Sequence, residues 1–211
     1  MKLTEYKAIR EAGMELGQEI FKLSTSVFKD DLIIAAKLLG LWNGKLMVFA
    51  DDNDTEALMD FMVFEKPTNH APAYQRFYDS NPKMTDLQQE NLNGILNFHS
   101  SLFEVKQIDS TSHTIIFVDL LDEDKKEFLL MDVGLSRTTS VGFIFYTRLI
   151  PIRDINMTSG LAFVFDNSLK EKLLSSISLA TFKKRRKLTS TERFLLFYEK
   201  NRQHGLNTRA E

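Results

Sequence analysis

Acidic side chains crowd one short part of the sequence and are the first candidates for chemistry. Asp119 is followed by Asp122, Glu123 and Asp124, and Asp132 comes shortly after them. Paired carboxylates can hold Mg²⁺ or share acid–base work. Most of this group falls in an expected hairpin turn, however, where solvated charge is the ordinary state. We therefore predict no catalytic residue, metal site or cofactor, and keep an enzyme with an acidic site near residues 119–132 as a second alternative.

A single arginine, Arg148, interrupts the apolar stretch from Gly142 to Ile152, and Arg153 follows it closely. An arginine on a buried strand must reach solvent or a carboxylate, because an unpaired buried charge is costly. Pairing of Arg148 with Asp119 or Asp132 is one interpretation. The other is a site that binds an anion. The sequence leaves both open.

The most distinctive charged run is five consecutive cations: Lys183, Lys184, Arg185, Arg186 and Lys187. Mutual repulsion predicts that this run is exposed. Residues 183–211 carry nine Lys or Arg against three acids, so the rest of the chain, whose total net charge is −2, is acidic. Binding to phosphates would release counterions, which would indicate salt-dependent nucleic-acid binding. The acidic remainder opposes that role and favours contact with an acidic protein surface, including that of another subunit.

Several patterns approach known motifs but lack a required residue. Gly134–Thr138 resembles the nucleophile elbow G-x-S-x-G, yet Thr138 replaces the second glycine and we expect a structural turn with no helix after it. Asp51–Asp54 lacks the glycine and glutamate of a calcium loop and fits the acidic start of a helix better. We expect surface or packing roles for the four widely spaced histidines: His70, His99, His113 and His204.

Composition narrows the class of protein. The 211 residues are 43% hydrophobic and long enough for one substantial core or two small ones. The absence of cysteine excludes disulfides, thiolate zinc sites and a cysteine nucleophile. No apolar run approaches the roughly 18 residues of a membrane span, so we expect a cytoplasmic protein with no membrane partner.

The N-terminal region, residues 1–100, is predicted to be helical. Apolar residues at 3,4 spacing and acidic or hydroxyl caps indicate helices within 6–23, 28–41, 51–66 and 85–100, with a single helical turn at 74–78. In one place two interpretations compete. The stretch around Asn43-Gly44 could join two strands as a hairpin, but the helix-favouring residues Ala35 to Leu38 favour a helix followed by a short strand.

Residues 101–166 form a β module with five apolar runs, the last of them opening at the turn Ser159-Gly160. We predict a small antiparallel five-stranded barrel or bent sheet, with Pro151 at an edge or a bulge. Residues 167–211 form a helical, basic C-terminal extension. There Ser168 is expected to cap one helix, and Thr189 with Glu192 has the spacing of a capping box for the last. The fold class is thus α+β.

The order SLFEV, DLLDED, RLIPI and SG before the last strand resembles a module of uncharacterised bacterial proteins, some of which carry a zinc-binding SEC-C motif. The resemblance covers about residues 30–166. It implies a bacterial origin and a recurring fold, and no established activity. Because this chain has no cysteine, the SEC-C zinc site is absent.

These observations predict a non-enzymatic binding or regulatory module that acts through protein contacts. The basic segment 183–187 is its expected interaction surface, with a protein partner or self-association as the expected binding mode. Weak nucleic-acid binding through the same segment is the first alternative.

Overall fold

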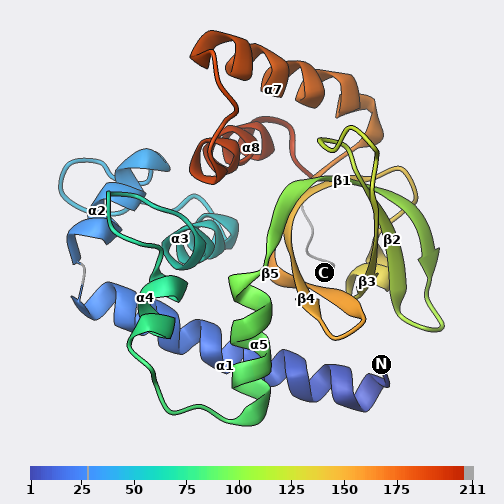
Figure 1. The fold of residues 1–211 in the computed structure, drawn as a ribbon. Helices are drawn as coiled ribbons and strands as arrows, with labels where there is room; N and C mark the ends of the chain where they lie inside the picture. Colours follow the sequence, from blue (N-terminus) through green and yellow to red (C-terminus); the bar gives the residue numbers. More distant parts are fainter. Residues whose placement is uncertain (28, 207–211) are drawn as a thin grey trace. The chain divides into compact units, whose positions relative to one another are not determined.

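The computed structural model describes residues 1–27 and 29–206 and divides into two compact units (Figure 1). The first unit is Met1–Asn97, and the second begins at Phe98 and takes in all later described residues. Helices fill the first unit, whereas the second holds all five strands and the C-terminal helices. The mixed α and β content, with helices at both ends, confirms the coarse fold prediction.

The first unit is built on one long helix. Its helices are α1 (Leu3–Val27), α2 (Lys29–Leu38), α3 (Asp52–Phe64), α4 (Ala73–Asp79) and α5 (Asp86–Leu96). The apolar face expected from the 3,4 spacing is buried in α1, at Tyr6, Ile9, Leu16 and Ile20. This face packs against the other four helices of the unit, which explains why α1 stays helical over its full length.

Local capping signals fix several helix starts in this unit. Asp51 accepts a hydrogen bond from the Asp54 amide, and Thr85 with Gln88 forms a capping box. Around Asn43-Gly44 the favoured prediction of a helix is confirmed by α2, and the competing interpretation of a two-stranded hairpin is wrong. Only an isolated bridge between Trp42 and Met47 remains of it. Phe28, expected in the second helix, lies outside the described residues.

Gly13 lies where α1 passes close to α5. A Cβ at this position would stand 2.6 Å from the Oδ1 atom of Asn91. Asn91 cannot easily move away, since its Nδ2 donates to the carbonyls of Ile9, at 3.0 Å, and Leu87, at 2.8 Å. Glycine at this position therefore allows the close approach of the two helices.

We expect Gly13→Ala to lower the free energy of unfolding by about 1–3 kcal/mol, because the methyl group overpacks the α1–α5 contact. Gly17→Ala on the same helix is the matched control. No atom lies within 4 Å of its added Cβ, so helix propensity alone should raise stability by up to about 1 kcal/mol. Urea denaturation of both variants measures the difference, and equal effects would contradict the packing argument.

Five strands of the second unit close into a barrel in the order β1-β2-β3-β5-β4. They are β1 (His99–Asp109), β2 (Thr114–Asp119), β3 (Glu127–Met131), β4 (Ile144–Ile152) and β5 (Ile155–Phe165). The expectation of a purely antiparallel sheet is wrong, because β3 and β5 pair in parallel at Leu130 and Asn156. A closed ring with an odd number of strands cannot alternate direction throughout, so one parallel pair is unavoidable.

Two strand boundaries differ from the prediction. The fourth expected helix ends at Leu96 rather than Ser100, and β1 begins at His99. The expected turn at Ser159-Gly160 lies inside β5, where Gly160 has φ +115° beside a register irregularity in the β4–β5 pairing. The chain reverses instead at Arg153, whose φ is 56°. Glycine can adopt positive φ within a bulged strand, which looks like a turn signal in the sequence.

Aromatic residues fill the barrel. Phe117 is fully buried and lies 5.5 Å from Phe103 and 5.4 Å from Phe145 between ring centroids. Alternate residues of β1, β2 and β4 supply this interior cluster, as the two-residue period of a strand requires. Pro151 lies beyond the last β1–β4 pair, His99 with Leu149, so its missing amide interrupts no bond to β1.

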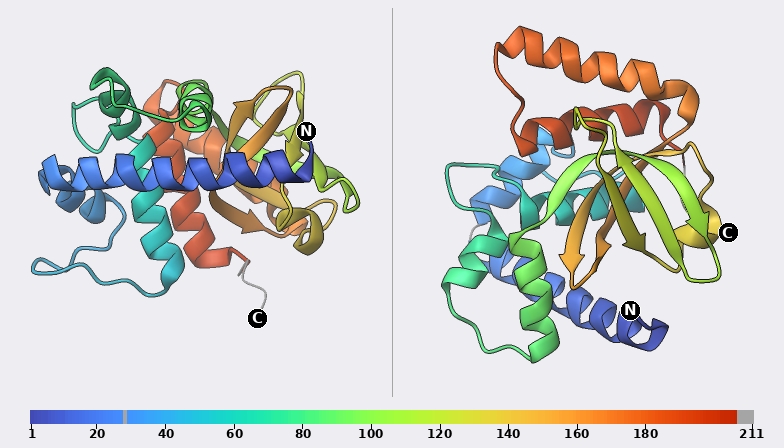
Figure 2. Two further views of the ribbon diagram at one scale, coloured as in Figure 1. Left: turned by 90° about the horizontal axis from the view of Figure 1, so that it is seen from below. Right: turned by 45° about the vertical axis from the view of Figure 1, so that its right-hand side comes forward.

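The remaining elements of the second unit are α6 (Leu135–Thr138), the 3₁₀ turn η1 (Asn167–Leu169), α7 (Lys170–Lys184) and α8 (Ser190–His204). Asp166, rather than Ser168, caps the turn that leads into α7. Thr189 and Glu192 form the expected capping box of α8. Figures 1 and 2 show α7 running beside α8 rather than beside the strands.

Helix α8 covers the outer face of β4 and β5. Tyr146 stacks on Phe197 at 4.5 Å between centroids, and Phe163 meets Phe194 edge-on at 5.2 Å. The two strands therefore bury aromatic side chains on both faces, which explains why their sequences do not alternate between apolar and polar residues. Over the described residues, no helix has the length and apolar character needed to cross a membrane.

Candidate functional site

The basic run 183–187 begins inside a helix and ends in the connection to α8. Lys183 and Lys184 form the last turn of α7, where cations complement the helix dipole. Arg185 ends the helix with φ 55°, a left-handed conformation that glycine usually supplies at this position. The exposed run expected from charge repulsion is thus a structured helix end.

Glu192 gathers two of the five cations. Arg186 donates from both terminal nitrogens to the two Glu192 oxygens at 2.8 Å, and Lys184 donates to one of them at 2.7 Å. Glu192 also accepts the Thr189 amide as the cap of α8. The hydrogen bonds from Arg186, Lys184 and Thr189 hold the pKa of Glu192 well below its usual range. This carboxylate therefore neutralises part of the run and fixes the α7–α8 connection.

The other three cations, Lys183, Arg185 and Lys187, are exposed and lie close in sequence to exposed apolar side chains. Leu179 is 53% exposed and Phe182 is 80% exposed, and their i, i+3 spacing places them on one face of α7. Within residues 1–27 and 29–206, no side-chain hydrogen bond or ion pair engages the remaining cations. We name this surface the α7 tip; it comprises Leu179, Phe182, Lys183, Arg185 and Lys187.

Arg148 is buried on the outer face of β4, with 2% of its surface exposed. Its Nη1 donates to the Ser100 hydroxyl at 2.8 Å, and Ser100 is its direct partner in β1. The guanidinium also lies over the rings of Phe98, at 5.4 Å, and Phe194, at 5.3 Å. Packing between aromatic rings explains how the sequence tolerates a charge in this strand. The anion-binding interpretation stays a prediction.

The residues that the sequence analysis grouped with Arg148 have different contact partners. Asp132 follows β3, and its carboxylate accepts the Leu135 amide at 2.9 Å and the Thr158 hydroxyl at 3.3 Å. Arg153 occupies the turn between β4 and β5. Asp119 is bound by groups of β1, described next. These contacts bring Arg148 to neither aspartate.

Asp119 ends β2 at one mouth of the barrel and is only 2% exposed. It accepts hydrogen bonds from His99 Nε2 at 2.6 Å, from the Ser101 hydroxyl at 2.5 Å and from the Leu121 amide at 2.8 Å. Burial alone raises the pKa of Asp119, but the bonds from His99, Ser101 and Leu121 outweigh it and lower the pKa below its usual value. The carboxylate is therefore anionic and holds His99 by one nitrogen.

His99 is the residue that sequence reasoning missed. Its ring stacks on Phe128 at 5.3 Å between centroids and meets Phe103 edge-on at 5.9 Å. The expected packing role is thus one part of its environment, and the bond to Asp119 is the other. A usable signal was present, since His99, Ser101 and Phe103 alternate along β1 and so share one face.

The other acidic and near-motif residues form no such constellation. Asp122 accepts the Asp124 amide at 2.9 Å in the exposed β2–β3 hairpin, as turn chemistry predicts. Among the described residues, no group of three or more His, Cys, Asp or Glu is placed to hold a metal ion. Ser136 donates to the Val133 carbonyl at 3.1 Å. The four-residue helix α6 lies inside the Gly134–Thr138 stretch, and no helix follows it before β4, as expected.

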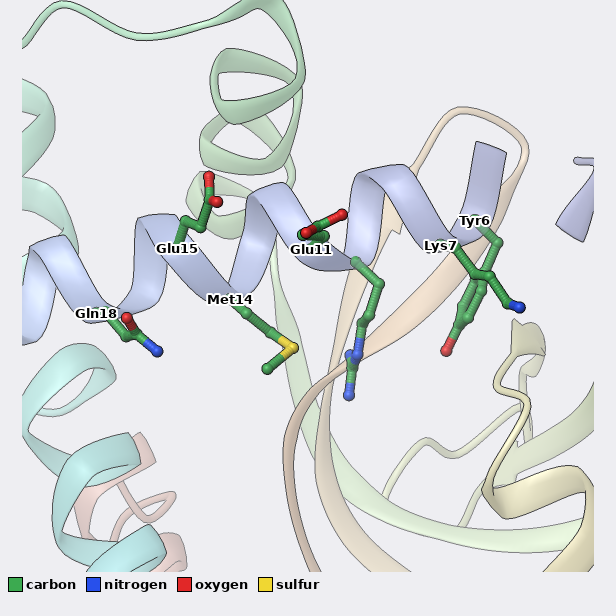
Figure 3. Close-up of a pocket in the computed structure, with 7 residues that line it drawn as sticks. Tyr6, Lys7, Glu11, Met14, Glu15 and Gln18 are labelled. Atoms are coloured by element: carbon green, nitrogen blue, oxygen red, sulfur yellow. The ribbon is translucent and has the colours of Figure 1, made fainter. Parts of the chain in front are cut away.

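One face of α1 lines a hollow of about 460 Å³ in the first unit (Figure 3). Seven residues line it: Tyr6, Lys7, Arg10, Glu11, Met14, Glu15 and Gln18. Two bases, Lys7 and Arg10, and two acids, Glu11 and Glu15, lie along this single helix, as is usual on a solvated helix face. The hollow therefore adds no constellation for catalysis.

Comparisons with known proteins place the chain in a family. Neither the curated proteins nor the solved structures contain a match to it. The model described as "Family of unknown function (DUF7986)" matches residues 1–211. This match confirms the predicted membership of an uncharacterised family, whereas the SEC-C relationship and the bacterial origin stay predictions. The chain belongs to the DUF7986 family of unknown function.

Proposed function

We propose that the protein is a non-enzymatic binding module that docks an acidic protein segment on the α7 tip. The observation that supports this role is the 80% exposure of Phe182 beside uncommitted cations. Burying a phenylalanine side chain contributes about 1.5–3 kcal/mol, so leaving it in water forgoes that free energy unless a partner covers it. An aromatic anchor with a charged rim is the usual anatomy of a protein–protein hot spot.

The arrangement of α7 supports the same interpretation. Leu173 is the one side chain of α7 among the buried residues, so most of the helix surface is free for contact. Leu179, Phe182 and Lys183 have i, i+3 and i+4 spacing and thus form a continuous strip. A partner that lays one apolar side chain on this strip would place its acidic neighbours close to Arg185 and Lys187.

Charge distribution favours an acidic protein over nucleic acid as the occupant. Glu192 pairs with Arg186 and Lys184 and adds a negative charge in the first turn of α8, next to the basic run. Lys183, Arg185 and Lys187, which no other described side chain engages, offer fewer phosphate contacts than the five-residue run suggested. Phe182 could stack on a base, so single-stranded nucleic acid is the competing ligand. An experiment must distinguish it from an acidic protein segment.

Binding of a labelled acidic peptide of about twelve residues, rich in Asp and Glu with one Phe and one Leu, tests the proposal by fluorescence anisotropy. We expect salt-sensitive binding to the wild type that weakens at least about tenfold in Phe182→Ser, since one buried anchor accounts for roughly 1.4 kcal/mol or more. Val141→Ser, at another exposed apolar residue of the second unit, is the matched control and should bind normally.

Two parallel titrations give the outcomes that would overturn the proposal. A single-stranded oligonucleotide bound more tightly than the peptide would favour the nucleic-acid alternative. Light scattering on wild type and Phe182→Ser reveals whether a second copy covers the tip instead. Absence of salt-sensitive peptide binding, or equal binding by Phe182→Ser and Val141→Ser, would remove the α7 tip as the docking surface.

A further inference from the structure

Two cations of the basic run converge on the carboxylate of Glu192. Arg186 donates from both terminal nitrogens at 2.8 Å, one to each carboxylate oxygen, and Lys184 Nζ donates to Oε1 at 2.7 Å. Two parallel bonds fix the plane of the guanidinium, and such charge-assisted pairs are the strong class of hydrogen bond. The Glu192 side chain is only 21% exposed, so it occupies donors that a phosphate group would otherwise contact.

The negative charge of Glu192 is more than the helix cap requires. Glu192 is the N3 residue of α8, and its side chain accepts the Thr189 amide in the capping box. Glutamine fills the same position in capping boxes, because one side-chain oxygen is enough for that bond. A carboxylate at this position also interacts favourably with the helix dipole. Neither role involves Lys184 or Arg186, so the two ion pairs have a consequence of their own, which is to keep two cations from other anions.

The connection between α7 and α8 has other supports besides Glu192. Leu188 is buried, and Arg193 Nη1 donates to its carbonyl at 3.1 Å. Arg186 Nη1 also donates to the Lys187 carbonyl at 3.0 Å. We therefore expect the backbone of this connection to stay in place when the charge of Glu192 is removed, so that a change in ligand preference can be measured without a change in fold.

Lys184 lies on the opposite side of α7 from the apolar strip. An α-helix turns through about 100° per residue, so Lys184, two positions after Phe182, is about 200° from it around the helix axis. A protein segment laid on the strip therefore does not reach Lys184, and takes its charge contacts from Lys183, Arg185 and Lys187. A nucleic-acid strand carries a phosphate at every nucleotide and can follow the helix end on both sides.

We propose that Glu192 is the specificity-determining residue of the α7 tip: it holds Lys184 and Arg186 back from phosphate groups and so favours acidic protein segments over nucleic acid. The inference rests on the proposed function, in which Phe182 anchors the protein ligand. Phosphate contacts supply essentially all of the non-specific affinity for nucleic acid, whereas an apolar anchor carries much of the affinity for a protein segment. Withholding two cations therefore weakens nucleic-acid binding far more than protein binding.

Glu192→Gln in the full chain tests this role, because glutamine keeps the capping box and removes the charge. Its control is Glu199→Gln, which changes the net charge equally at an exposed acid of the same helix that accepts Gln203 Nε2 at 3.1 Å. Fluorescence anisotropy measures binding of a labelled oligothymidylate and of the acidic peptide from about 50 to about 200 mM salt. The slope of log K against log salt counts the phosphates that the protein neutralises, and a merely structural role of Glu192 would not change it.

For the oligothymidylate we expect a slope of about −2 in the wild type and in Glu199→Gln, from Lys183, Arg185 and Lys187, and of about −3.5 in Glu192→Gln, from the whole run. At the lower salt concentration Glu192→Gln should bind the oligothymidylate at least about tenfold more tightly than the wild type, and the peptide less than about threefold more tightly.

Two kinds of failure are distinguishable. Equal slopes in Glu192→Gln and Glu199→Gln, or equal gains for oligothymidylate and peptide in Glu192→Gln, would overturn the role of Glu192. The proposed function would still stand in that case if the wild type binds the peptide. Absence of peptide binding by the wild type would overturn the proposed function, and with it the preference assigned to Glu192.

Discussion

Replacing Phe117 by alanine is expected to lower the free energy of unfolding by about 3–5 kcal/mol. Phe117 is fully buried at the centre of the barrel and lies between Phe103 and Phe145. Truncation removes the transfer free energy of the ring and leaves a cavity that the strands cannot close, because their hydrogen bonds around the ring of five hold the backbone in place. It is the largest effect of a single substitution that we expect.

Phe182→Ala is the matched control for this prediction, because it removes the same ring from a position that is 80% exposed. Its unfolding free energy should stay within about 0.5 kcal/mol of the wild-type value. Urea denaturation followed by far-UV circular dichroism measures both variants. Fluorescence of Trp42, the single tryptophan, reports separately on the first unit. Similar losses in the two variants would contradict the closed aromatic core.

Asp119→Asn is expected to have the second largest effect, a loss of about 2–4 kcal/mol near neutral pH. The carboxylate accepts bonds from His99, Ser101 and the Leu121 amide. An asparagine amide has one oxygen, so at least one of these donors would lose its acceptor and face an NH₂ group instead. The loss of charge also removes the partner that orients His99.

The pH dependence of this loss has a definite sign. The folded-state pKa of Asp119 lies below its usual value, so its contribution is fully present above the unfolded value of about 3.9. The contribution disappears as the pH falls through the lower folded-state pKa. We therefore expect the difference between wild type and Asp119→Asn to be constant from neutral pH to about pH 5 and to shrink below about pH 4.

Asp124→Asn is the control for Asp119→Asn, because Asp124 is an exposed carboxylate of the same β2–β3 hairpin. It should change the unfolding free energy by no more than about 0.5 kcal/mol at any of these pH values. The comparison matters because other carboxylates, including Asp109 and Asp166, also have lowered pKa values and contribute to acid unfolding of every variant. A pH-independent difference for Asp119→Asn would argue against an anionic Asp119 in the folded protein.

Local signals in the sequence predicted most of the helices. The 3,4 spacing of α1 and the capping box at Thr189 depend on residues three or four positions apart, and the structure contains both. The exposed cations at the end of α7 follow from composition in the same way. These features are determined within a few residues of the chain, so a single sequence is enough to predict them.

Strand boundaries depended on partners that are distant in sequence. His99 and Ser100 were predicted as the end of a helix, yet β4 supplies hydrogen-bond partners that bring them into β1. Gly160 reads as a turn but lies in a bulge of β5, because its neighbours pair with β4 on both sides of the irregularity. Strand propensity is set by such tertiary context more than by the residues themselves.

The candidate sites show the same division. The sequence by itself predicted the helical N-terminal and C-terminal regions, the five apolar strands, the basic run and the absence of cysteine chemistry. These features depend on composition and short-range spacing. Only the tertiary structure decided that Arg148 meets Ser100 and two aromatic rings, that Glu192 takes two cations from the basic run, and that His99 meets Asp119. The Glu192 contacts depend on how the connection between α7 and α8 folds back on the first turn of α8. For Arg148 and His99 the physical reason is the closure of the barrel, which fixes strand register and so brings together side chains whose separation in sequence carries no sign of their contact.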